Sequence, residues 1–151
     1  MKALCALIRR VGEDEVTTIL DELAKTITNA KTESGKRNIS TNALKTALGD
    51  IQPSVAAKGI QKCAPQLLPG IEQEDVLEIK ADCMDILSDV LKRFGDLVAG
   101  SHQHMVAALM PQLTHKLATV RKRAVACIGA CLAGVILPDG LLPPCCAGAR
   151  R

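Results

Sequence analysis

Aromatic residues are almost missing from this sequence: Phe94 is its one phenylalanine, and there is no tyrosine and no tryptophan. A core without rings has to be built from Leu, Ile, Val, Ala and Cys, which favours helix-on-helix packing over a β-sandwich. The absence argues against binding of single-stranded nucleic acid, because bases have no rings on which to stack. It also removes the usual anchors of a small-molecule pocket.

A strong excess of charge is missing as well. The 151 residues carry 19 basic and 16 acidic side chains, a net charge of +3, which is too small for a general nucleic-acid binder. The distribution of charge is more informative. Residues 72–96 hold the acids Glu72, Glu74, Asp75, Glu78, Asp82, Asp85, Asp89 and Asp96, whereas residues 97–138 hold no acid and the cations Lys116, Arg121, Lys122 and Arg123. Patches of both signs favour a protein partner.

Membrane and disulfide signals are also missing. The apolar stretch 3–8 is too short for a secretory signal, and the uncharged run 124–137 has the length of a buried helix. The seven cysteines include no CxxC pair, and most stand in apolar runs. We therefore expect reduced thiols that act as small core residues in a reducing compartment, cytoplasmic or nuclear.

Helical patterns recur along the chain at a nearly constant interval. Gly12, Gly49, Gly95 and Gly134 each follow an apolar helical stripe and are 37, 46 and 39 residues apart. Such glycines are typical of left-handed residues that close helices. The spacing fits HEAT or armadillo helix pairs, whose period is roughly 40–47 residues. We predict an all-α solenoid with a leading helix at about 1–11 and three antiparallel pairs: 14–28 with 36–49, 54–70 with 76–94, and 101–114 with 118–134.

The predicted apolar stripes are Val16, Ile19, Leu20, Leu23, Ala24 and Ile27; Ile39, Ala43, Ala47, Leu48 and Ile51; Ile79, Cys83, Ile86, Leu87, Val90, Leu91 and Phe94; Val106, Leu109, Met110 and Leu113; and Val120, Ala124, Cys127, Ile128, Cys131 and Leu132.

Smaller signals refine this prediction. Pro65 and Pro111 occupy similar places in two first helices, so a bend is expected in each. Asp75 and Glu78 are typical of a capping pair before the longest stripe. Residues 137–151 contain several prolines and glycines, which predicts a loose tail after a solenoid segment of 1–136.

Two motifs carry a resemblance to a known family. The L-x-P-x-L of 109–113 and the V-R-x-x-A of 120–124 are similar to the HEAT-repeat consensus. The longer stretches MPQLTHKLATVRKRAVACIG, QEDVLEIKADCMDILSDVLKRFG and ISTNALKTALGDIQPS resemble the N-terminal repeats of the cullin-associated, neddylation-dissociated family. The resemblance covers about 1–136. Because members of that family are several times longer, we expect this chain to be a fragment.

The resemblance implies a role. Members of that family wrap around a cullin–RING scaffold that lacks its ubiquitin-like modifier, release the bound substrate adaptor and so allow adaptor exchange. Their N-terminal repeats lie near the C-terminal region of the cullin and the RING subunit. The implied function of this chain is partial: it binds the scaffold and does not exchange adaptors. Two alternatives stay open, a generic HEAT scaffold in transport or phosphatase assembly, and a small helical enzyme.

The candidate partner-binding residues are the cations Arg121, Lys122 and Arg123, together with Lys116. Second helices and the loops before them line the concave face of a solenoid, where these residues can contact an acidic patch. The alternative for Arg121 is a structural contact with a neighbouring carboxylate, and for the other two simple solvation.

Other clusters favour structural interpretations. Asp82, Asp85 and Asp89 share one side of a helix and are expected to be a solvated face, with a partner contact as the alternative. His102 and His104 are two residues apart, so on a helix they face different ways and would ligate a metal poorly. We therefore expect both to be surface residues at a helix start. No catalytic or cofactor motif was found, so neither an enzyme nor a cofactor is expected. The uncapped ends of a cut solenoid predict modest stability and self-association.

Overall fold

The computed structural model describes residues 10–73 and 76–134, and every regular element within them is a helix. The order is α2 (Glu13–Thr28), α3 (Ser34–Asp50), α4 (Pro53–Gln66), α5 (Leu68–Glu72), α6 (Leu77–Phe94), the 3₁₀ helix η1 (Gly95–Ser101), α7 (His102–Leu109), the 3₁₀ helix η2 (Met110–Thr114) and α8 (Ala118–Gly134). The expected leading helix at 1–11 and the tail at 137–151 lie outside the described residues, apart from residues 10 and 11.

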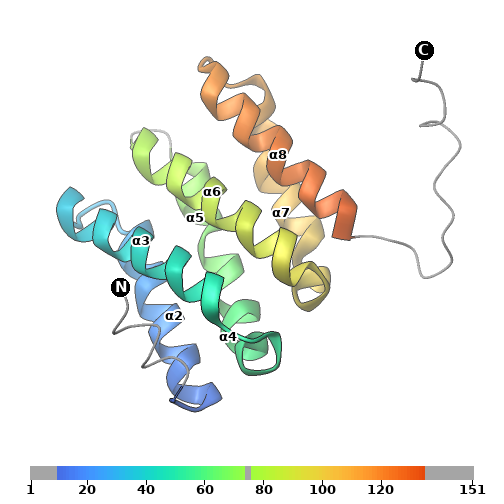
Figure 1. Ribbon diagram of the computed structural model, residues 1–151. Coiled ribbons are helices and arrows are strands. Elements are labelled where there is room, and N and C mark those ends of the chain that lie inside the picture. The colour runs from blue at the N-terminus through green and yellow to red at the C-terminus, as the bar shows by residue number, and fades with distance from the viewer. Residues whose placement is uncertain (1–9, 74–75, 135–151) are drawn as a thin grey trace, which may run out of the picture.

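The helices form three stacked antiparallel pairs, as the sequence predicted (Figure 1). The first helices of the pairs, called A helices here, are α2, α4 with α5, and α7 with η2. The second or B helices are α3, α6 and α8, which lie side by side in Figure 1, with the A helices behind them. The chain is therefore an all-α solenoid segment.

Both expected bends occur in the A helices. The first break follows Pro65 by one residue, since α4 ends at Gln66 and α5 begins at Leu68. The second precedes Pro111 by one residue, since α7 ends at Leu109 and η2 begins at Met110. A proline inside a helix removes one backbone hydrogen bond and its ring displaces the preceding turn.

The aliphatic stripes form one continuous core along the stack. In α2 the fully buried members are Val16, Leu20, Ala24 and Ile27, whereas the predicted members Ile19 and Leu23 are half-buried. All seven predicted residues of the α6 stripe are buried: Ile79, Cys83, Ile86, Leu87, Val90, Leu91 and Phe94. The middle unit, with neighbours on both sides, is therefore the best-buried part of the described chain.

Three residues of the predicted stripes were assigned wrongly to the core. Ile39 is 67% exposed, Met110 53% and Leu132 67%. Leu132 stands where Leu91 stands in the preceding B helix, and Leu91 is buried because α8 packs beside α6. Periodicity identifies the apolar face of a helix but not whether a neighbour covers it.

The predicted helix ends were also wrong in their detail. Gly12 precedes α2 in an extended conformation, Gly49 lies inside α3, and Gly95 has a right-handed φ of −51°, so none of these three closes a helix in the left-handed region. The expected capping pair is described only at Glu78. Asp75 lies outside the described residues, the N-cap of α6 is Val76, and Glu78 instead pairs with Arg37, whose Nη2 is 3.6 Å from its Oε2.

Close packing within the second helix pair places α5 against α6. A β-carbon at Gly70 would lie 2.5 Å from Sγ of Cys83, 3.2 Å from Ile79 and 3.3 Å from Thr28. A side chain at this position would require at least one of these neighbouring atoms to move. None of the helices in the described part of the chain is long and apolar enough to cross a bilayer.

Candidate partner-binding face

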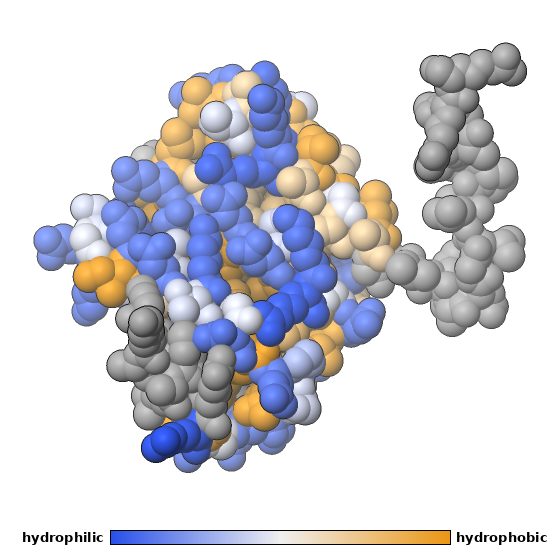
Figure 2. Space-filling view, viewed as in Figure 1, coloured by the Kyte–Doolittle hydropathy of each residue, from blue (hydrophilic) through white to orange (hydrophobic). Residues whose placement is uncertain are grey.

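The three B helices form a broad polar face. Figure 2 shows this face largely hydrophilic, whereas pale and orange residues gather along α8 at its upper right edge. The helices are joined by polar contacts between successive units: Thr41 of α3 donates to Asp82 of α6 at 3.2 Å, and Arg93 of α6 donates to the carbonyls of Leu48 and Ile51 at 2.6 and 3.0 Å. These contacts fix the register of the face on which the predicted binding residues stand.

Two of the four predicted residues are free cations. Lys116 lies in the turn before α8 and Lys122 in the first turns of α8, and both are exposed. Neither makes an ion pair with any described residue. Lys122 stands near the positive end of the helix dipole, which disfavours a cation there. Both side chains are therefore available to a partner that carries negative charge.

Arg121 holds the turn before α8. Its Nη1 donates to the carbonyl oxygens of His115 at 2.7 Å and of Lys116 at 3.0 Å, while the residue stays exposed. Among the described residues Arg121 meets no carboxylate, in contrast to the alternative interpretation. Its structural role is instead to orient the turn that carries Lys116.

The cation that meets a carboxylate is Arg123. Its Nε donates to Oδ1 of Asp85 at 2.8 Å, and Oδ2 of Asp85 is 3.9 Å from Nζ of Lys45, so one carboxylate links all three B helices. Both Arg123 and Asp85 have side chains 37% exposed, and water screens such a pair. Arg123 is thus partly committed within the chain.

The acidic row of α6 is less uniform than expected. Asp82 accepts from Thr41 and Asp85 from Arg123, whereas Asp89 is exposed and has no partner among the described residues. The prediction of a solvated face holds for Asp89 alone. Stacking of α3 and α8 against both sides of α6 uses the other two carboxylates.

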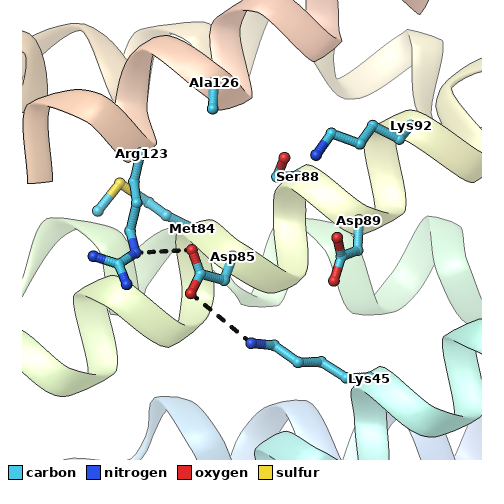
Figure 3. A pocket seen from close by; sticks show the side chains of 8 residues that line it. All are labelled: Lys45, Met84, Asp85, Ser88, Asp89, Lys92, Arg123 and Ala126. Atoms are coloured by element: carbon cyan, nitrogen blue, oxygen red, sulfur yellow. Dashed lines mark hydrogen bonds and ion pairs between the residues drawn. The ribbon is translucent and has the colours of Figure 1, made fainter. Parts of the chain in front are cut away.

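A hollow of about 290 Å³ opens where the three B helices meet (Figure 3). It is lined by Lys45, Met84, Asp85, Ser88, Asp89, Lys92, Arg123 and Ala126. Sequence reasoning did not select Lys45, Ser88 or Lys92. The signal that could have found them is the repeat register, because residues about 41 positions apart face each other across neighbouring B helices.

The histidine prediction was half wrong. His104 is exposed, but His102 is 8% exposed, and its Nε2 is buried without a hydrogen-bond partner among the described residues. The 3₁₀ helix η1 continues directly into α7 and carries His102 inward. In the described residues no group of three or more His, Cys, Asp or Glu side chains lies close enough to hold a metal ion.

Four cysteines are reduced and buried: Cys63, Cys83, Cys127 and Cys131. Burial raises the pKa of the first three to about 12, because the apolar surroundings disfavour a thiolate. The prediction of core thiols is confirmed for these four. Cys5, Cys145 and Cys146 lie outside the described residues.

Comparison with known proteins gives the family. The chain is 37% identical over 128 residues to cullin-associated NEDD8-dissociated protein 1 of Drosophila melanogaster, with 83% of the chain and 10% of the relative covered. It is 30% identical over 143 residues to the protein of the same name in Arabidopsis thaliana, with 94% and 11% covered. The chain is a homologue of the cullin-associated NEDD8-dissociated proteins.

The chain matches only a small part of each relative. The Dictyostelium discoideum protein is 33% identical over 134 residues, with 85% of the chain and 11% of the relative covered. The chain thus spans about a tenth of the length of the curated relatives it matches. No protein-family model matches the chain.

Proposed function

We propose that the chain is a non-catalytic segment that binds a cullin, unmodified and in complex with its RING subunit, through the face of its B helices. The observation that carries the proposal is the homology to proteins whose names state association with a cullin. The face supports it, since Lys116 and Lys122 are exposed and uncommitted while Arg121 fixes the turn between them.

These cations would contact an acidic patch on the partner, with Arg123 at the edge of the contact. Charged groups on such a rim act mainly on the association rate and on the choice of partner. We propose further that this segment does not release a substrate adaptor by itself. The chain spans about a tenth of its relatives, so the exchange activity of a whole protein needs the rest.

The test is titration calorimetry of the purified chain against a cullin–RING complex with and without its ubiquitin-like modifier. We expect binding to the unmodified complex and weaker binding to the modified one. The double variant Lys116→Gln/Lys122→Gln should weaken binding and make it less dependent on salt.

The control is Lys31→Gln/Lys58→Gln, which removes the same charge from the turn after α2 and from the A helix α4, where Lys58 Nζ lies 3.3 Å from Oε2 of Glu13. It should bind as the unaltered chain does. Equal losses in both double variants would show that net charge, and not this face, is recognised. Release of an adaptor by the chain alone would contradict the proposed division of labour.

A further inference from the structure

A groove runs between α6 and α8 beyond the cations discussed above. The hollow of about 290 Å³ and a second of about 550 Å³ both lie between these helices, and Lys92 lines both. Beyond Arg123, the α8 wall is formed by Ala126, Ala130 and Ala133. Because alanine side chains end at the β-carbon, they leave open a space that longer side chains would fill.

The wall of this groove contains an unsatisfied hydroxyl group, that of Ser88. The residue is 6% exposed, and its Oγ is buried without a hydrogen-bond partner among the described residues. Buried hydroxyl groups in native proteins are normally hydrogen-bonded, and each exception requires an explanation. Ser88 lines the hollow, so a ligand there is one explanation.

Lys92 lines the same hollow as this hydroxyl. Figure 3 shows the end of Lys92 directed toward Ser88, on the side of α6 that faces α8, whereas the Asp89 carboxylate points away toward α3. Lys92 is exposed and makes no ion pair with any described residue. The other carboxylate of the hollow, on Asp85, is occupied by Arg123 and Lys45.

These two groups define the chemistry of an occupant. An ammonium can only donate hydrogen bonds, and a serine hydroxyl can donate one, so a group bound by both must be an acceptor. The positive charge of Lys92 favours a carboxylate over a neutral carbonyl. The exposed lysine side chain has rotatable bonds, which let the ammonium move aside and admit the carboxylate beside Ser88.

We propose that the α6–α8 groove is a specific site for an Asp or Glu side chain of a protein partner, bound by Nζ of Lys92 and Oγ of Ser88. This inference rests on the proposed function and names the group of the partner that is recognised. The site is separate from the surface cations Lys116 and Lys122, which bind by general charge.

The first experiment joins the two groups covalently. The chain is mixed with the unmodified cullin–RING complex and treated with a carbodiimide, which activates a carboxyl group; attack by the lysine amine forms an amide, and the carbodiimide leaves as its urea. We expect mass spectrometry to find Lys92 joined to one acidic residue of the partner. Binding without a Lys92 cross-link would overturn this inference and leave the proposed function standing, whereas absence of binding would overturn both.

Two variants separate recognition from stability. Lys92→Met should raise the Kd for the cullin–RING complex about tenfold, as expected for loss of a charge-assisted hydrogen bond. The control Lys31→Met removes the same charge from an exposed turn and should change Kd less than twofold.

Ser88→Ala should raise Kd by about threefold without lowering Tm, because the hydroxyl has no partner in the unbound chain. A lower Tm for Ser88→Ala, or an unchanged Kd for both Ser88→Ala and Lys92→Met, would show that these groups serve only the fold.

Discussion

Replacing Gly70 by alanine tests the packing of α5 on α6 directly. The added methyl group would meet Sγ of Cys83 at 2.5 Å, and the methyl carbons of Ile79 and Thr28 at 3.2 and 3.3 Å. Cys83 is fully buried, so its sulfur has little room to move. Overpacking of this kind costs about 1–3 kcal/mol.

The helical preference of alanine over glycine offsets part of that cost, by about 0.5–1 kcal/mol. We expect Gly70→Ala to lower the free energy of unfolding by about 1–2 kcal/mol. For a chain of this size each kcal/mol shifts Tm by about 2–4 °C. Far-UV circular dichroism is the suitable measurement, since there is no Trp or Tyr to report by fluorescence.

The matched control is Gly129→Ala in α8, where an added β-carbon would meet nothing within 4 Å. Only the gain in helical preference acts there, so Tm should rise by about 1–4 °C. Opposite signs at the two glycines would separate packing from propensity.

A double variant identifies the atom responsible. Cys83→Ala alone should cost about 1 kcal/mol of stability through lost burial, but in the Gly70→Ala background it removes the closest clash. The two changes together should therefore be less harmful than their separate effects added, with a coupling of about 1 kcal/mol or more. Strict additivity, or a Gly70→Ala chain as stable as the original, would refute the described packing.

Three further outcomes follow from individual groups. Hydrogen bonding from Lys25 lowers the pKa of Asp21 below its ordinary value of 3.8. The stabilising effect of the Asp21 carboxylate is therefore present above that value and is lost as pH falls through the lower pKa of the folded chain. The Tm difference between the unaltered chain and Asp21→Asn should shrink on acidification, and a constant difference would contradict this. Cys63 and Cys127, each with a pKa of about 12, should resist iodoacetamide at mildly alkaline pH until denaturant is added, as peptide mass spectrometry would show. Arg93→Gln should cost about 1 kcal/mol in a denaturant titration by releasing the carbonyls at the end of α3, whereas Lys31→Gln should cost nothing measurable.

The positions of the helices could be predicted from the sequence, because periodicity and proline act over only a few residues. The 3.6-residue stripes located α2, α3, α6 and α8 to within a few residues, and the two prolines marked the breaks in the A helices. Helix ends were less readable, since Gly49 and Gly95 continue helical backbone where closure was expected. A glycine permits a left-handed conformation but does not require it.

The candidate site was readable only in part. A run of three cations is visible in any sequence, but their partners are not. Arg121 donates hydrogen bonds to backbone carbonyls in the turn before α8, whereas Arg123 donates to an aspartate 38 residues earlier in the chain. Ser88 was not selected, because an isolated serine in a helix is usually a surface residue and only the repeat register places it opposite α8.

The sequence by itself determined an all-helical chain, the repeat of paired helices and the aliphatic seam, since these depend on periodicity and on residue types within one or two turns. Tertiary structure alone decided which apolar residues are covered, which charges are committed and where the α6–α8 groove opens. Those properties depend on groups about 40 residues apart that meet only when successive units stack. Spacing along the chain does not specify how closely two helices approach or which side chains fill the space between them.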